Sequence, residues 1–483
     1  MNWLIDFLLH RGNDLSTYFL PHAYFFKRSI LQLHQIPLWN PIQFTGLPYL
    51  ADPQNFIFYP PNYAFVLLPV ETAFILLLGL HFLWAGLGTY YFAKTHFKLP
   101  RWFAIFAALA FVFTPKIFSH LEAGHYTMLV AFSWLPWFFL VKNPIFMALI
   151  AAFMYYNYIT IAFYALLFLC FYALYTKKLA ARRYALAALI FLLLISPSFI
   201  AQLKFAPLST RSLITYADVA QPIWSLKLFF QNLFFPFFLN HQQLSTERVL
   251  FPGLVIWFLA ILGWWKYRHP SRWFFAGWLI FSLLFALGDR IPFFVFFYKY
   301  FPIIKWLRVT TRPWIITNLF LAIFAGLGLP KKSSAVYVLI LLSFIDISLI
   351  NYKIFQKPIP VDLTPASFYE LINQNTKPPL RVYCTTGCFS LQKLGELGIW
   401  SLSGNNPIQS RQFVDALQLA AGYSYSQYSP ALPPYQVFSA QPQPNARLMA
   451  ALDTKYIASS YRLIDPGFRL IYQDGGYFLY TVQ

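Results

Sequence analysis

Acidic residues are scarce in this chain, and charged residues of any kind are few. Only 11% of its 483 residues are charged and 16 are Asp or Glu, whereas about 25% of residues are charged in an ordinary soluble domain. Hydrophobic residues make up 59% of the chain and the mean hydropathy is +0.53. Because a single hydrophobic core stops growing near ~250 to 300 residues, this composition excludes a soluble globule and indicates a membrane protein.

Cysteine is also rare, with three residues in the chain. Cys170 lies in an apolar run, while Cys384 and Cys388 flank a Thr-Thr-Gly turn. A disulfide between the last two requires an oxidising compartment. The spacing alone leaves that pairing open.

Basic residues outnumber acidic ones and give a formal charge of +20, most of it before residue 352. In an apolar region, such an excess is typical of cytoplasmic loops that obey the positive-inside rule and of contacts with anionic lipid or phosphate. Nucleic acid is therefore not expected as a partner.

Apolar runs of spanning or near-spanning length predict about ten membrane helices. These runs cover residues 71–93, 102–118, 125–141, 144–158, 160–176, 184–203, 249–265, 273–288, 313–329 and 335–351. The first nine residues reach only about 13 Å as a helix and cannot span a ~30 Å core. Residues 13–69 are polar, aromatic and rich in proline, which indicates one long structured loop.

The last part of the chain has shorter apolar runs, and Asp474-Gly475-Gly476 is typical of a tight hairpin. We therefore predict an α-helical polytopic membrane domain over 1–352, with its long outer loop at 13–69, and a small α+β domain over 353–483. If the loop is outside and the helix breaks near Asn157, strict alternation puts every short basic loop inside. The C-terminal domain is then extracytoplasmic, in the plasma membrane of a prokaryote.

Carboxylates on the predicted outer face are the candidate catalytic groups, because one near the membrane can have a raised pKa and accept a proton from a hydroxyl. We single out Asp14, Asp52 and Glu122. The structural alternatives are a helix cap at Asp14 and a turn at Asp52, in Ala-Asp-Pro.

The segment His120-Leu-Glu-Ala-Gly-His125 brings two histidines and a glutamate into one turn between helices. Its spacing matches no common zinc signature. We expect structural or substrate hydrogen bonds there, His125 included, and no metal ligand set, although a divalent metal cofactor is not excluded.

Basic residues cluster in the predicted outer loop 289–312, where Lys305, Arg308 and Arg312 lie near the start of a membrane helix. If this segment is helical, Arg308 and Arg312 project from one face at the lipid boundary. Guanidinium pairs bind phosphate well, and the alternative is anchoring to lipid headgroups. The cluster favours a phosphate site.

Several motifs together resemble the YfhO-like bacterial membrane proteins, which belong to the GT-C class of polytopic glycosyltransferases. The motifs are Gly12-Asn13-Asp14, IPLWNPIQFTGLPYLADPQ with FYPP, GHYTMLVAFSWLPW, LGDRIPFF with FPIIKWLRVTTRPW, GNNPI and LMAALDTKYI. Their order and spacing extend along the whole chain.

The resemblance implies transfer of a sugar from a polyprenyl-phosphate carrier to a glycan, lipid or protein acceptor outside the cytoplasm. Asp14 falls at the family's loop aspartate and would be the base, and Arg308 and Arg312 would bind the donor phosphate. Direct displacement would invert the anomeric carbon. Family members carry a full helix before the aspartate, so a wrong start codon, truncation or lost activity are three explanations for the short start here.

Two other classes of function remain. An inactive relative or scaffold for envelope assembly would fit the short N-terminus and the sizeable outer domain. A lipid or glycan transporter would also be polytopic and basic, but it should carry ionisable residues in mid-membrane, where the sequence offers chiefly Asp346.

Overall fold

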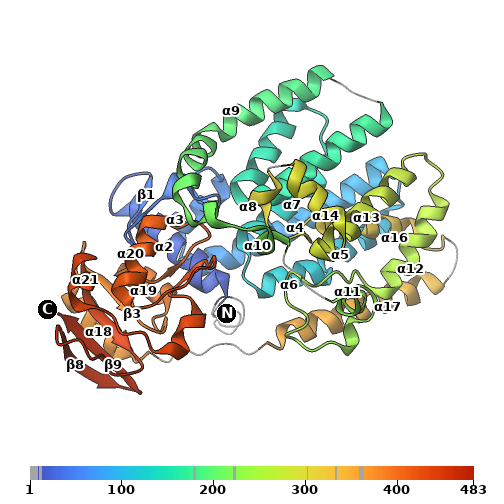
Figure 1. Cartoon of the computed structure of the whole chain (residues 1–483). Helices are drawn as coiled ribbons and strands as arrows, with labels where there is room; N and C mark the ends of the chain where they lie inside the picture. Colours follow the sequence, from blue (N-terminus) through green and yellow to red (C-terminus); the bar gives the residue numbers. More distant parts are fainter. Residues whose placement is uncertain are drawn as a thin grey trace. The chain divides into compact units, whose positions relative to one another are not determined.

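The computed structural model describes residues 9, 13–177, 181–220, 225–301, 303–331, 334–357 and 364–483, without the side chain of residue 306. Two compact units are present (Figure 1). The first unit joins Met1–Phe74, Pro197–Ile214 and Ile359–Gln483, and the second joins Ile75–Ser196 and Thr215–Pro358. The division at residue 352 remains a sequence-based prediction about domains; packing groups the N-terminal loop with the C-terminal residues.

The second unit is helical. Its apolar helices are α4 (Val70–His96), α5 (Arg101–Val112), α6 (Pro115–Glu122), α7 (Tyr126–Leu140), α8 (Pro144–Thr176), α9 (Ala181–Phe205), α12 (Leu254–Lys266), α13 (Arg272–Ala286), α16 (Trp314–Gly328) and α17 (Ala335–Phe355). Short elements between them are α10 (Tyr216–Ala220), α11 (Leu226–Phe234), η6 (Pro236–Phe238), η7 (Gly288–Arg290), α14 (Pro292–Tyr300) and α15 (Ile304–Leu307). Helices α4 and α9 begin or end in the first unit.

Five helical segments are long and apolar enough to cross a bilayer, and four shorter apolar helices accompany them. The five are Val70–His96, Arg101–Glu122, Pro144–Thr176, Ala181–Leu208 and Ala335–Phe355. The short helix α16 is buried along almost its whole length. The chain is a polytopic membrane protein, with α16 as the central helix of this unit.

Helix α16 packs against α12 with almost no side chain between their backbones. A Cβ added to Gly263 would lie 1.8 Å from the carbonyl oxygen of Phe324, and one added to Gly328 would lie 2.0 Å from that of Leu259. Glycine at such contacts is typical of closely approaching membrane helices. Both contacts lie toward the C-terminal end of α16, whereas the candidate site lies before its N-terminal end.

The predicted break in the run 144–176 lies one residue from an observed irregularity. Helix α8 is interrupted at Tyr158, whose φ of −150° and ψ of 93° are not helical. The expected helix 102–118 is also divided, because Pro115 starts a new helix after Thr114. Pro115 has no backbone N–H to donate to the preceding turn, so α5 ends at Val112 and α6 begins at Pro115.

The first unit contains the N-terminal loop and an α+β domain. The loop elements are η1 (Leu15–Phe19), α2 (Leu20–Leu31), β1 (Trp39–Asn40), β2 (Leu47–Pro48), η2 (Tyr49–Ala51), η3 (Pro60–Tyr63) and α3 (Ala64–Leu67), and residues 206–213 add η4 (Ala206–Leu208) and η5 (Thr210–Leu213). The domain elements are α18 (Ala366–Asn375), β3 (Arg381–Cys384), α19 (Leu391–Leu397), β4 (Trp400–Ser401), β5 (Gly404–Asn405), α20 (Arg411–Ala421), β6 (Ala431–Leu432), η8 (Tyr435–Ala440), α21 (Ala446–Ala451), β7 (Thr454–Ser459), β8 (Phe468–Asp474) and β9 (Tyr477–Val482).

The domain is built on a five-stranded sheet with the order β4-β3-β7-β9-β8. Strand β3 runs parallel to β4 and β7, and β9 runs antiparallel to β7 and β8. The predicted hairpin is confirmed: Gly475 and Gly476 have φ of 56° and 79° between β8 and β9. Cys384 and Cys388 form a disulfide, and Cys170 is free and exposed.

The N-terminal loop and the C-terminal domain share one hydrophobic core. Phe44 and Leu47 of the loop are buried with Tyr383, Leu402 and other residues of the domain. The backbone N–H of Ser401 donates to Ile42 O at 2.8 Å. The loop is therefore an integral part of this unit.

Candidate functional site

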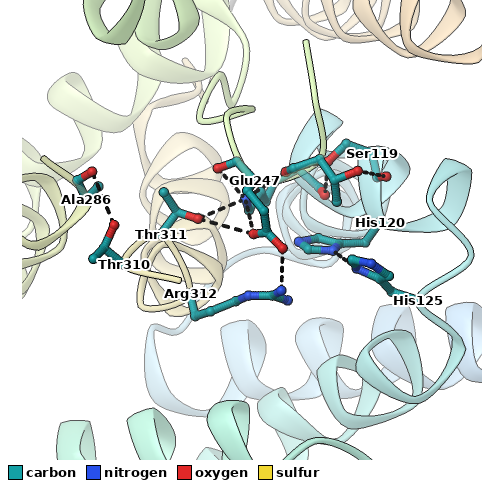
Figure 2. Close-up of polar contacts among 10 residues, drawn as sticks. Ser119, His120, His125, Glu247, Ala286, Thr310, Thr311 and Arg312 are labelled. Carbon is teal, nitrogen blue, oxygen red and sulfur yellow. Dashed lines mark hydrogen bonds and ion pairs between the residues drawn. The ribbon is translucent and has the colours of Figure 1, made fainter. Parts of the chain in front are cut away.

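Three charged side chains from distant parts of the sequence meet in the second unit. Glu247 lies in the loop before α12, Lys116 lies in the first turn of α6, and Arg312 immediately precedes α16. Figure 2 shows the Glu247 carboxylate between Arg312, Thr311 and the histidines of the α6–α7 turn. The Glu247 loop is held in place by a buried apolar cluster that includes Leu244 and Val249.

Lys116 is fully buried and fixes the loop to the helix. Its ammonium donates to the carbonyl oxygens of Thr246 at 3.0 Å and Glu247 at 3.3 Å, and to Oγ1 of Thr311 at 3.4 Å. The distance from Nζ to Oε2 of Glu247 is 3.9 Å. A second link joins the same segments, since Thr246 Oγ1 donates to Ser119 O at 3.1 Å.

Arg312 is 4% exposed and pairs with Glu247 through one nitrogen. Its Nη2 donates to Oε1 of the carboxylate, and its guanidinium lies over the ring of Tyr158 at 4.9 Å. The atoms Nε and Nη1 are buried without a hydrogen-bond partner among the described residues. Buried donors left unpaired are costly, so these N–H groups are suited to an anionic ligand.

We call Lys116, Glu247 and Arg312 the Glu247 cluster. The electrostatics of this cluster are asymmetric. Burial alone would raise the pKa of the Glu247 carboxyl, but Arg312 and Lys116 outweigh this effect and lower the pKa below its usual value. The carboxylate is therefore ionised at neutral pH, and it faces the Arg312 guanidinium and the Lys116 amine. The two unpaired N–H groups of the buried guanidinium favour binding of an anion.

Two histidines lie beside the cluster, with Nδ1 of His120 and Nδ1 of His125 2.8 Å apart. Ligand atoms of His120, His125 and Glu247 lie within 4.8 Å of one another, and Nε2 of His120 is buried without a hydrogen-bond partner in the described part of the chain. Two imidazoles and a carboxylate suit a divalent cation such as zinc. The residues thus fit a metal ion, although Glu247 would have to share its charge with Arg312 and Lys116.

Other predicted residues of the second unit lie in separate contacts. Glu122 accepts from Nζ of Lys357 at 2.5 Å, and the Lys305 ammonium lies 5.3 Å from the ring centroid of Tyr298. The prediction that Arg308 and Arg312 project from one helical face is wrong. Helix α15 ends at Leu307, and Arg308 has a φ of 36°, which an α-helix does not allow.

In the first unit, Asp14 begins the helical segment η1 but does not cap it. No cap hydrogen bond reaches its side chain; Oδ1 of Asn13 accepts from the Leu15 N–H at 3.1 Å instead. Helix capping is the predicted alternative role for Asp14, but the neighbouring residue Asn13 makes this contact instead. That Asp14 faces Arg308 and Arg312 across one cavity stays a prediction.

Asp52 is 2% exposed and accepts three hydrogen bonds. Oδ2 accepts from the Tyr18 hydroxyl at 2.6 Å and from Nδ2 of Asn406 at 2.9 Å, and Oδ1 accepts from the Gln54 N–H at 2.9 Å. Its contacts join the N-terminal loop to the C-terminal domain. These contacts give it a clear structural role, whereas its catalytic role stays a prediction.

Glu247, Lys116, Thr311 and Tyr158 were not selected from the sequence. A lysine inside an apolar run is a signal that could have found Lys116, because ionisable residues in membrane helices are rare and commonly functional. Glu247 belongs to the few acidic residues before 352, but nothing in its local sequence singles it out. Only the fold brings it to Arg312.

No protein-family model matches the sequence, and neither does any curated protein. Solved structures do resemble it. The arabinofuranosyltransferase AftD from Mycobacteria is similar over 100% of this chain, with 14% identity and a TM-score of 0.58. A second AftD structure, of a mutant, is similar over 99% of this chain, with 12% identity and a TM-score of 0.54.

This chain covers 39% and 41% of the two AftD chains. ArnT from Cupriavidus metallidurans is 12% identical over 99% of this chain and 96% of its own, with a TM-score of 0.43. The likeness to AftD shows the fold. The protein is an α-helical polytopic membrane protein with a GT-C-like fold and a small C-terminal α+β domain.

Proposed function

We propose that the protein is a membrane glycosyltransferase that transfers a sugar from a polyprenyl-phosphate donor to an extracytoplasmic acceptor. The observation that carries this proposal is the buried Arg312 of the Glu247 cluster, whose Nε and Nη1 have no hydrogen-bond partner among the described residues. The GT-C-like fold shared with an arabinofuranosyltransferase supports it.

The cluster has the chemistry that a phosphate leaving group requires. As the bond from the sugar to the phosphate breaks, negative charge grows on the phosphate oxygens, and fixed cations stabilise that charge. Arg312 offers a planar fork whose Nε and Nη1 are without partners among the described residues, and Lys116 fixes the loop that carries Glu247. Glu247 holds both cations in place between reactions.

Asp14 is the proposed base. A carboxylate that takes the proton of the acceptor hydroxyl assists direct attack on the anomeric carbon, which inverts its configuration and needs no glycosyl-enzyme. The catalytic contribution of Glu122 is then indirect, through its ion pair with Lys357.

An outer location of residues 13–69 and 353–483 is part of the proposal, as is the plasma membrane of a prokaryote. Strict alternation with a break beside Asn157 supports it, and α8 is interrupted at Tyr158. The disulfide between Cys384 and Cys388 also supports it, because disulfides persist in oxidising compartments.

A divalent metal is a second candidate ligand, favoured by the geometry of His120, His125 and Glu247. If bound there, it would neutralise charge on the donor phosphate. Metal content of the purified protein, measured with and without chelator, distinguishes the two ligands. The phosphate assignment requires undecaprenyl phosphate to raise the unfolding temperature of chelated protein.

The test of the function is transfer from a radiolabelled polyprenyl-phosphate sugar by the purified full chain in lipid nanodiscs. Asp14→Asn keeps the shape and removes the base, so transfer should fall by about 10² or more. Asn13→Ala is the control for local structure: it removes the cap of η1 and should cost about 1 kcal/mol in stability while most transfer remains. Undiminished transfer by Asp14→Asn would contradict the assignment of Asp14.

Arg312→Ala should weaken donor binding strongly, because it removes the unpartnered donors. Arg290→Ala is its matched control, since Arg290 is 42% exposed and pairs with Asp289 outside the Glu247 cluster. If the wild-type chain binds donor lipid but transfers no sugar, the protein is an inactive relative or scaffold. Equal donor affinity in both arginine variants would contradict the phosphate site.

A further inference from the structure

A cavity of about 630 Å³ lies within the first unit, where η1 meets the C-terminal domain. Its walls come from η1, from the turn after β3 with the start of α19, and from β5, β6 and η8. Its volume is within the ~300 to 1,000 Å³ range of small-molecule sites. All of these elements belong to the same unit, so the cavity does not depend on the placement of the membrane helices.

The lining of this cavity combines aromatic rings with neutral polar groups. Tyr435 and Phe438 come from η8, Gln392 comes from α19, and Asn405 comes from β5. Tyr435 is 74% exposed, so its ring is accessible to a ligand. Flat apolar rings and amides that both donate and accept match the apolar faces and hydroxyl edges of a sugar.

One buried polar atom in the wall is unpaired. Ser403 is 4% exposed and lines the cavity, and its hydroxyl oxygen has no hydrogen-bond partner in the described ranges. A buried hydroxyl normally has a partner, and leaving it without one is costly. A hydroxyl-rich ligand in this cavity would supply that partner after a small side-chain rotation.

The cavity adjoins the segment that starts at Asp14. Ser16 and Thr17 both line it, and they follow Asp14 by two and three residues. Thr17 is fixed in place because Nδ2 of Asn405 donates to its Oγ1 at 2.9 Å and its own hydroxyl donates to Asn13 O at 3.0 Å. The wall of the cavity and the proposed base are thus parts of one short helical turn.

We propose that this cavity binds the acceptor, and that the acceptor is an oligosaccharide. The inference rests on the proposed glycosyltransferase function and specifies its acceptor class. The ring of Tyr435 stacks on one sugar, Gln392 and Ser403 bind hydroxyls, and the terminal hydroxyl is directed to the η1 end of the cavity. Charge plays a smaller part, because Lys393 and Glu396 at the wall are of opposite sign.

Binding is measured by saturation-transfer NMR on the full chain in detergent, with maltotriose, cellotriose and chitotriose as probes. At least one trisaccharide should bind, and Tyr435→Ala should weaken it by about 5- to 10-fold, the loss expected for one stacked ring. Leu419→Ala is the matched control, since Leu419 is equally exposed at 74% but does not line the cavity. A second pair compares Gln392→Ala with Gln436→Ala, whose side chain lies outside the lining.

The outcomes separate this inference from the function on which it rests. Asp14→Asn should bind the trisaccharide as the wild type does, because the base is not needed for binding. If Tyr435→Ala loses saccharide binding and Leu419→Ala keeps it, the result supports the cavity as a saccharide site even if the chain transfers no sugar. If no trisaccharide binds, or if Tyr435→Ala and Gln392→Ala bind like their controls, the cavity is not the acceptor site, even where transfer activity is present.

Discussion

Arg312 holds the carboxylate of Glu247 with Nη2 alone and leaves Nε and Nη1 without partners among the described residues. A bidentate pair would be the stronger arrangement for two charges that only stabilise the fold. The one-sided pair therefore leaves two N–H groups of the guanidinium available, and these are the groups that we propose bind the donor phosphate.

Replacing Glu247 by Gln should destabilise the protein and sensitise it to anions. Lys116 and Arg312 lose their counter-charge, at a cost of about 1 to 3 kcal/mol for buried groups left unpaired. Undecaprenyl phosphate should then raise the unfolding temperature more in Glu247→Gln than in the wild type. Asp289→Asn is the control, because Asp289 is 34% exposed and pairs only weakly with Arg290 at 3.7 Å. If undecaprenyl phosphate raises the unfolding temperature equally in Glu247→Gln and Asp289→Asn, the result would count against the phosphate interpretation.

The same carboxylate predicts a dependence of stability on pH. The pKa of Glu247 is lowered in the folded protein from its ordinary value of 4.5, because Arg312 and Lys116 outweigh burial. Its contribution is therefore complete at neutral pH and is lost as the pH falls below about 4.5 and passes through the lower folded pKa. The difference in unfolding temperature between the wild type and Glu247→Gln should shrink over that interval. A difference that is constant down to pH 3 would contradict the lowered pKa.

Asp52→Asn should lower stability more than any exposed acidic change in the same unit. The amide keeps only one acceptor oxygen, so either the two donors at Oδ2, Tyr18 and Asn406, or the Gln54 N–H at Oδ1 would lose an acceptor, at about 1 to 3 kcal/mol for each donor left unpaired. Asp415→Asn, at a residue whose side chain is 66% exposed, is the control and should change little. If Asp52→Asn is as stable as the wild type but inactive in transfer, Asp52 is catalytic after all.

Sidedness is tested by labelling single cysteines in intact cells. The background is Cys170→Ala, because Cys170 is free and exposed while Cys384 and Cys388 are joined. His34→Cys and Ser439→Cys, both at exposed positions, should react with an impermeant maleimide, and Lys177→Cys in a basic loop should react only after lysis. Protection of just one of the first two positions would overturn the shared outer location.

Local patterns in the sequence predict much of the fold. Apolar runs locate the helices, and the Asp474-Gly475-Gly476 turn locates the β8–β9 hairpin. The interruption at Tyr158 lies next to the break that charge alternation requires. By contrast, the conformation of Arg308 does not follow from its spacing to Arg312, because Arg308 and Val309 both have a positive φ that no periodicity reveals.

The candidate site is harder to predict, because its members are far apart in the sequence. Asp14 is found from its neighbourhood, and Arg312 from a local cluster of basic residues. Glu247 joins Arg312 across a separation of 65 residues and joins Lys116 across 131. Such pairs are set by how the helices and loops pack together, which local sequence patterns do not reveal.

The composition of the first unit constrains how the protein is made. Its core combines Phe44 with Leu402 and Phe413, and Asp52 with Asn406, so residues near the two ends of the chain complete each other. During synthesis we expect the N-terminal loop to stay unfolded, or bound by other factors, until the intervening helices have inserted and the C-terminal domain has been released. A C-terminal domain expressed alone would expose the surface that Phe44 covers, and we expect it to aggregate unless residues 13–69 are supplied in trans.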